Sequence, residues 1–398
     1  MTLPATVVSV RSGIGGSLLP PVRRPWRVAM MALALAAGGC GSPPPQFALN
    51  LEGRRPESVS PKQREAVQKA LHKLFGTPDE PSVAEETHLR AELLAMAAGP
   101  VGGDAQGNQR GLFRRHCVTC HGISGDGAGP TAAVLDPYPR DFRLGLFKYT
   151  STRGGAKPVR RDLRRTLLRG LPGTAMPSFA QLRSGEIDAL IEYVRYLSLR
   201  GQTELYLVEL VVDGDEPLPL TMDFVVRDGL TPLARSWAAP EEDPAEWVVV
   251  PPPRPSVDTP EALAESVARG RALYASKQAQ CVRCHGPDGS GQGQETELYD
   301  DANKRKKGVT PEQTAEIAPR FRLPIQRLRP RDFRQGVFHG GAAPEDIYLR
   351  IALGIKGTPM PGAGAAPGVR AVLSPEETWH LVSFIRALGA GAETNPPP

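Results

Sequence analysis

The sequence predicts a mainly α-helical protein with two similar domains, and three observations support this prediction. The pattern Cys-x-x-Cys-His occurs twice, as CVTCH at 117–121 and CVRCH at 281–285. Each copy is followed by an RDF triplet, a Gly-Thr-x-Met-Pro segment and an apolar stretch with helical spacing. Four shared features in one order indicate an internal repeat of whole domains. We therefore place the two repeats at 105–201 and 258–390.

The first 39 residues have the pattern of an export signal. Basic residues precede an apolar run from Val28 to Ala37, and small residues follow it. The run is about half as long as a membrane-spanning helix requires. The stretch from Ala37 to Cys40 resembles the cleavage box of bacterial lipoproteins, which implies a lipid on Cys40. Ordinary signal cleavage or an uncleaved anchor is the alternative. We predict a signal peptide at 1–39 and a flexible tether at 40–58.

Residues 59–104 are expected to be a helical segment that could pack on the first repeat. Ser60-Pro61 is a helix start, and Gly76 follows an apolar series with helical spacing. A second helix is expected within EETHLRAELLAMAAG at 85–99. His72 and His88 are interpreted as surface or core residues rather than ligands.

Both repeats carry clear helix signals. In the second repeat, Thr259-Pro260 suits a helix start, and Ser374 begins a capping box for the last helix. In each repeat, a helix ahead of the methionine segment ends at a glycine, Gly170 or Gly354. The last helices carry apolar residues at helical spacing: Ile187, Leu190, Ile191, Val194 and Leu197 in the first repeat, and Leu381, Phe384, Ile385 and Leu388 in the second.

The segment between the repeats, 202–257, is expected to be an acidic insert that contains β-structure. ELYLVELVV and WVVV look like strands, and PPPRP looks like a linker. Residues 203–257 contain 11 acidic and 3 basic residues, net −8, whereas 107–200 contain 7 acidic and 16 basic residues, net +9. Two solvated surfaces are the simplest interpretation. The alternative is that the insert docks on the basic domain or guides a charged partner.

The repeats differ in length ahead of the RDF triplet. From the motif histidine to the RDF phenylalanine there are 21 positions in the first copy and 48 in the second. The extra residues coincide with the charged stretch 299–317, which we predict to be a surface insertion. Residues 391–398 are predicted to be a disordered tail. The overall charge of +5 does not by itself indicate a nucleic-acid partner.

Apart from Cys40, all cysteines lie in the two Cys-x-x-Cys-His motifs. Disulfides, a redox pair or a zinc ion bound by four thiolates are alternatives for such cysteines. A histidine directly after each pair favours another chemistry, because Cys-x-x-Cys-His is the attachment signal of c-type haem. The two thiols add to the haem vinyl groups, and the histidine reaches the iron. We therefore predict two covalently attached c-type haems.

Methionine is the expected second ligand of each iron. If residues 1–39 are removed, four methionines remain, and two of them, Met176 and Met360, occupy the Gly-Thr-x-Met-Pro segments. A thioether is a soft ligand that favours ferrous iron and raises its potential. The flanking prolines stiffen the loop, so little entropy is lost when the ligand binds. Met222, in the insert, is interpreted as a packing residue.

These motifs resemble class I cytochrome c domains, and the two repeats together resemble a dihaem cytochrome c. The resemblance covers roughly residues 105–200 and 260–390. It implies a small helical bundle around one haem in each domain, with one histidine and one methionine on the iron. The residues carried over are Cys117, Cys120, His121 and Met176 for the first haem, and Cys281, Cys284, His285 and Met360 for the second.

The resemblance also implies two packing details. In the family, the first helix crosses the last helix closely at a glycine. Gly270 matches this glycine in the second repeat, and Gly111 matches it less regularly in the first. A loop proline in the family often presents its carbonyl to the ligand histidine. Pro130 aligns with that position, whereas the second copy has Gln294 there.

The resemblance implies an electron carrier rather than an enzyme. We expect it in the periplasm or cell envelope of a bacterium, held to the membrane only by a lipid on Cys40. Its partners would be a redox donor and an acceptor, or a larger respiratory complex, and not nucleic acid. One alternative is a dihaem peroxidase, which needs one haem with an open site. Another is a haem-based sensor in which a gas displaces one methionine.

Overall fold

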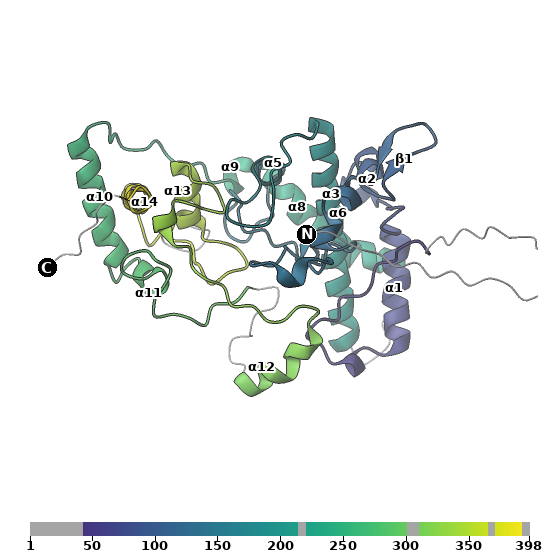
Figure 1. The fold of residues 1–398 in the computed structure, drawn as a ribbon. Helices are drawn as coiled ribbons and strands as arrows, with labels where there is room; N and C mark the ends of the chain where they lie inside the picture. The colour runs from purple at the N-terminus through teal and green to yellow at the C-terminus, as the bar shows by residue number, and fades with distance from the viewer. Residues whose placement is uncertain (1–42, 214–219, 301–309, 365–370, 392–398) are drawn as a thin grey trace, which may run out of the picture. The chain divides into compact units, whose positions relative to one another are not determined.

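The computed structural model describes residues 43–213, 220–300, 310–364 and 371–391, and the described residues from Pro44 onward belong to one unit. The predicted signal peptide, Cys40 and most of the predicted tail lie outside the described residues. The regular structure is almost entirely helical, as predicted, with a two-stranded antiparallel sheet of β1 (Gly102–Gly103) and β2 (Gln109–Arg110) (Figure 1). None of the helices in the described ranges combines the length and apolar character that crossing a bilayer requires.

The N-terminal segment is helical and packs on the first repeat. It contains η1 (Pro56–Ser58), α1 (Pro61–Phe75), η2 (Glu85–Thr87) and α2 (Ala91–Ala97). Ser60 and Gln63 form a capping box at the start of α1, and Gly76 ends the helix, as predicted. The second helix is shorter than expected because His88 takes a left-handed conformation, φ 51°, which separates η2 from α2. Both α1 and α2 contact α6.

The first repeat is organised around one long helix, α6 (Ser184–Asp213), which contacts α1, α2, α3, α5 and η4. Phe113 of α3 packs on Tyr193 of α6, with ring centroids 4.9 Å apart. Gly111 does not provide the close helix crossing; it is the N-cap of α3 with φ 76° and packs on the backbone of Pro100. The other elements of the repeat are α3 (Leu112–His116), α4 (Val118–His121), η3 (Ala132–Val134), η4 (Phe142–Leu144) and α5 (Arg160–Arg169).

The insert differs from the expected β-structure. Residues 204–212 form the second half of α6, because Leu207, Val208 and Val211 lie at helical spacing and are buried in the core. At the other end, Val248 forms an isolated β-bridge with Thr152. Between them lie α7 (Met222–Phe224), the π-helical turn η5 (Val225–Leu230), α8 (Thr231–Glu242) and α9 (Pro244–Trp247).

The insert is docked on the first repeat, largely through aromatic and backbone contacts. Trp237 is fully buried, and its ring lies 5.9 Å from that of Phe147 in the first repeat. The Val249 N–H donates to the Ser151 carbonyl at 2.8 Å. A charged contact is also present, from the Arg160 N–H to the Glu241 carboxylate. The docking interpretation therefore describes the insert better than two separate solvated surfaces.

The second repeat is a smaller bundle in which the first and last helices cross (Figure 1). Its helices are α10 (Pro260–Ala275), α11 (Cys281–His285), α12 (Pro311–Ile317), η6 (Ala318–Arg320), η7 (Phe333–Gln335), α13 (Pro344–Leu353) and α14 (Pro375–Gly389). Thr259 caps α10 and Ser374 forms a capping box with Glu377, as predicted. The crossing is at Gly270, as expected: a Cβ there would overlap the His380 carbonyl oxygen of α14.

The two repeats touch through charged side chains of α5 and α13. Asp346 accepts hydrogen bonds from Arg165 at 3.1 Å and Arg169 at 3.0 Å. Arg350 Nη1 donates to the Lys148 carbonyl at 3.0 Å. Asp346 and Arg350 belong to the second repeat and their partners to the first, so these contacts hold the repeats against one another.

The predicted surface insertion of the second repeat also lies on the first. We call the described residues 298–300 and 310–328, which contain the described part of that predicted insertion (299–317), the strap. Its two ends pair with each other, since the Leu328 N–H donates to the Leu298 carbonyl at 2.8 Å. Residues 310–317 of the predicted insertion are mostly exposed, but Asp300, and Arg322 beyond its end, form ion pairs with the first repeat.

Candidate cofactor sites

The two Cys-x-x-Cys-His motifs have the same backbone geometry. α4 and α11 each end at a glycine with positive φ, 73° at Gly122 and 76° at Gly286. The loop after each helix folds back on the histidine: the Gly127 N–H donates to the His121 carbonyl at 2.9 Å, and the Gly291 N–H donates to the carbonyl of the second histidine at 2.8 Å. Glycines at these turns therefore let both loops close in the same way.

The four motif cysteines are free thiols. Burial raises the pKa of Cys117 to about 12 and that of Cys281 to about 11, so both are neutral at pH 7. In the part of the chain that the structure describes, no group of three or more His, Cys, Asp or Glu residues could hold a metal ion. The geometry therefore supports neither the disulfide alternative nor the four-thiolate zinc alternative.

Each motif histidine stacks on the phenylalanine of the RDF triplet. Ring centroids are 4.4 Å apart for His121 and Phe142, and 4.5 Å apart for His285 and Phe333. Burial lowers the pKa of both histidines to about 4. Both imidazoles are therefore neutral near pH 7 and have a lone pair available for a metal.

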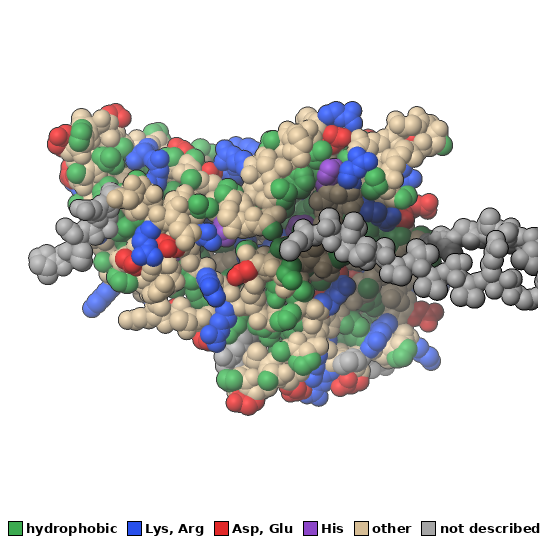
Figure 2. All heavy atoms as spheres, in the orientation of Figure 1, with side chains coloured by type: hydrophobic (Ala, Val, Ile, Leu, Met, Phe, Trp, Pro, Cys, Tyr) green, Lys and Arg blue, Asp and Glu red, His purple; other side chains and the backbone are tan. Residues whose placement is uncertain are grey.

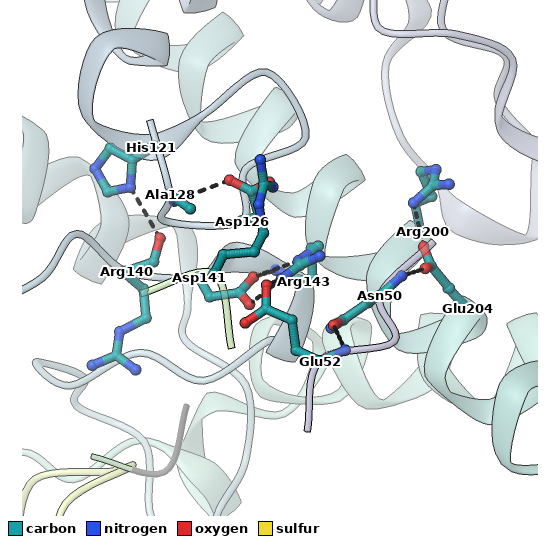
Figure 3. A network of polar contacts seen from close by, with 11 residues as sticks. Asn50, Glu52, His121, Asp126, Ala128, Arg140, Asp141, Arg143, Arg200 and Glu204 are labelled. Atoms are coloured by element: carbon teal, nitrogen blue, oxygen red, sulfur yellow. Dashed lines mark hydrogen bonds and ion pairs between the residues drawn. The ribbon is translucent and has the colours of Figure 1, made fainter. Parts of the chain in front are cut away.

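A backbone carbonyl fixes the orientation of His121. Its Nδ1 lies 3.0 Å from the Arg140 carbonyl oxygen (Figure 3). Because a carbonyl only accepts, Nδ1 carries the proton and Nε2 is left for iron. The expectation of Pro130 as the partner is therefore wrong: Pro130 is exposed, and the RDF segment provides the carbonyl instead.

The second histidine is held less firmly. Nδ1 of His285 is buried and has no hydrogen-bond partner in the described residues. Burial lowers the pKa of His285, and the backbone of Arg331, which aligns with Arg140, acts in the opposite direction, as the backbone of Arg140 does at His121. The two sites are therefore alike in the stacking of the motif histidine and differ in the geometry around its Nδ1.

The two methionine loops share one hydrogen-bond pattern. In each, the residue after the helix-ending glycine donates its N–H to the methionine carbonyl: Leu171 to Met176 at 3.0 Å, and Ile355 to Met360 at 3.1 Å. The threonine hydroxyl of each Gly-Thr-x-Met-Pro segment then donates back to that same residue and accepts from the methionine N–H. Both methionine side chains are half-buried.

The threonine of this loop has a testable role. In Thr358→Val, the loop loses the hydroxyl that donates to the Ile355 carbonyl at 2.7 Å and accepts from the Met360 N–H at 3.3 Å. We expect about 1–2 kcal/mol of lost stability for two hydrogen bonds. Thermal unfolding of the purified protein, followed by circular dichroism, measures the loss. Thr358→Ser keeps the hydroxyl and is the control; equal stability of the Val and Ser variants would contradict the role.

The cytochrome c family model matches residues 108–198 and 267–389, more than half of the chain. The chain belongs to the cytochrome c family. The family holds c-type haem covalently, so this cytochrome is a haem c protein with a redox role. Among solved structures, a chain of a reducing HAO-like protein complex from Kuenenia stuttgartiensis is similar, with 23% identity and a TM-score of 0.46, over 70% of this chain and 93% of that chain. No curated protein matches this cytochrome.

The residues of both sites fit a c-type haem. Each site offers two free thiols next to a neutral imidazole, and at His121 the bonded Nδ1 leaves Nε2 for the iron. The roles of Phe142 and Phe333, and of the loop threonines, were not predicted from the sequence. Their recurrence in both copies of the repeat was the signal that could have found them.

Proposed function

We propose that this cytochrome is a dihaem electron carrier of the bacterial cell envelope. Each haem would be attached through one Cys-x-x-Cys-His motif, with His121 and Met176 on the first iron and His285 and Met360 on the second. The protein would accept an electron from one redox protein and pass it to another, without forming or breaking bonds in a substrate.

The observation that carries this proposal is the matching methionine loop in both domains. A helix-ending glycine, a threonine that bonds the loop twice and a methionine recur with the same hydrogen bonds. A side chain at either helix-ending glycine would clash with this loop. A Cβ at Gly170 would lie 2.7 Å from the Met176 carbonyl oxygen, and a Cβ at Gly354 would lie 2.5 Å from the Met360 carbonyl oxygen. Two loops built alike favour two six-coordinate irons over one open site.

In this proposal, residues of the chain hold and orient each haem and exclude water from it. When bound, the haems supply one-electron iron chemistry. Phe142 and Phe333 cover one face of the ligand imidazoles, and the buried residues 124–127 keep water away from the first of them. Because the arrangement is already fixed in the protein, little has to move when the charge of the iron changes.

The partners are proposed by class only. On the face drawn in Figure 2, basic and acidic side chains are interspersed, which suits a partner with a mixed surface. A redox donor and an acceptor, or a larger respiratory complex, fit this role. We further propose that Cys40 carries a lipid that holds the protein to the membrane; this rests on the sequence of the N-terminus.

Spectra of the haem-loaded protein test the proposed ligands. We expect a methionine–iron band in the near infrared that falls by about half in Met176→Ala, by about half in Met360→Ala, and is lost in the double variant. Met222→Ala is the control and should keep the full band, since Met222 packs against the core of the first domain.

A full-strength band in either single ligand variant would refute that ligand. Rapid turnover of peroxide by the wild type would favour the peroxidase alternative, and loss of the band under a gas ligand would favour the sensor. The same samples therefore separate the three functions.

A further inference from the structure

The strap connects the second domain to the haem site of the first. Besides α12 and η6, it holds Asp300 at one end and Arg322 further along. The antiparallel bridge between Tyr299 and Arg327 closes its base. It comes from the sequence between His285 and Phe333, so it belongs to the second domain, but its contacts lie elsewhere.

The strap grips the loop that follows the first haem motif. Arg322 pairs with Asp126, and the Tyr138 N–H donates to Gln326 Oε1 at 3.2 Å. This loop, which runs from His121 to Arg140, is mostly buried at Ser124–Gly127. The carboxylate of Asp126 itself accepts from the Ala128 N–H at 3.0 Å (Figure 3). The strap thus covers the histidine side of the first site.

Asp300 holds Arg140 in a two-pronged ion pair. Both guanidinium nitrogens lie 3.1 Å from the two carboxylate oxygens, and Lys148 Nζ approaches the same carboxylate at 2.7 Å. All three side chains are about 15% exposed. Bidentate pairs of this kind are among the stronger and more directional contacts in proteins.

Arg140 passes this restraint to the ligand histidine. Its carbonyl accepts the His121 Nδ1–H, while its side chain extends away from the imidazole (Figure 3). Asp300, Arg140 and His121 are therefore linked by successive contacts that begin in the second domain and end at the proposed haem ligand of the first. Hydrogen bonds to the outer nitrogen of a ligand histidine raise its basicity and set its orientation.

The second site lacks the carboxylate contact of this series. Arg331 aligns with Arg140 but has no carboxylate partner in the described residues, and Nδ1 of His285 is unbonded. The aligned loop is also open, with Pro287 and Asp288 exposed. The second site therefore has no counterpart of the Asp300 carboxylate in the described residues.

We propose that Asp300 is a positioning residue for the first haem, acting across the domain boundary through Arg140 on His121. This inference rests on the proposed function, because it takes His121 as an iron ligand. A firmly bonded histidine donates more to ferric iron, so the strap lowers the potential of the first haem.

The test is the reduction potential of each haem, measured by spectroelectrochemistry on the full-length dihaem protein. Met176→Ala and Met360→Ala backgrounds assign each wave to its haem. In Asp300→Asn we expect the ferrous-to-ferric ratio of the first haem at a fixed potential to rise by about threefold to tenfold. The second haem should not change.

Arg140→Lys separates positioning from the electric field of Asp300. Lysine keeps the positive charge but not the planar fork that binds both carboxylate oxygens. We expect a shift in the same direction as for Asp300→Asn. Glu297→Gln removes a carboxylate just before the strap, paired with the exposed Arg327 of the strap, and should shift neither haem.

Three outcomes would overturn the proposal. They are an unchanged first haem in Asp300→Asn, equal shifts of both haems, or a shift in Asp300→Asn with none in Arg140→Lys, which would be a field effect only. A wild type without two histidine–methionine haems would instead refute the proposed function, and the two failures are therefore distinct.

Discussion

Gly270→Ala is expected to unfold much of the second domain. A Cβ at this position would overlap the His380 carbonyl oxygen and lie 2.8 Å from Phe384 Cβ, so α10 and α14 would have to separate. Because the overlap is with backbone atoms, no change of side-chain rotamer can relieve it. We therefore expect the free energy of unfolding to fall by about 3 kcal/mol or more, after allowing for a gain of about 1 kcal/mol in helix propensity. Denaturant unfolding followed by circular dichroism measures the cost.

The effect should be large because this domain has a small core. Its buried apolar cluster is made by α10, α13, α14 and the RDF segment, whereas the first domain shares its core with α1, α2 and the insert. Gly185→Ala, in the first turn of α6, is the matched control, since a Cβ there meets nothing within 4 Å. It should leave stability unchanged or raise it by up to about 1 kcal/mol. Similar stability of both variants would show that the crossing tolerates a side chain.

Removing one pair of motif cysteines is expected to remove one covalent haem. The double variant Cys117→Ser, Cys120→Ser should retain one haem, as should Cys281→Ser, Cys284→Ser, and the protein without all four should retain none. The thioether bonds need these thiols, and the described residues contain no cysteine outside the two motifs that could replace them. The mass of the denatured protein, expressed in cells that attach c-type haem, counts the haems.

Cys40→Ser provides the control for this count. It removes a cysteine outside both motifs, so two haems should remain, while any lipid on that residue would be lost. A pair variant that still carries two covalent haems would contradict the assignment of that motif. One haem on the wild type would contradict the dihaem proposal.

Local signals made the main elements of this cytochrome predictable. The capping residues of α1, α10 and α14 and the glycines that end α5 and α13 act over a few residues, so the sequence displays them directly. The haem motifs and methionine segments were also found as short patterns, and their recurrence supported each assignment. Their role as ligands stays a prediction.

Long-range packing explains what was not predicted. The stretch 204–212 is rich in Leu and Val and looked like a strand, but α6 continues through it because the core lies along one helical face. The pair of Arg140 and Asp300 joins residues 160 positions apart, and neither periodicity nor composition encodes such a contact. The histidine partner Arg140 was missed for a similar reason, because it lies 19 positions after His121.

The strap also makes the order of the two domains along the chain matter, although the repeat itself does not set an order. Two identical copies could exchange places, but here only the second carries the segment that completes the first. A chimaera with two first domains would leave Arg140 and Lys148 without Asp300, and one with two second domains would carry a strap with no matching loop beneath it. The two copies are therefore unequal halves, and the contacts of the strap depend on their order along the chain.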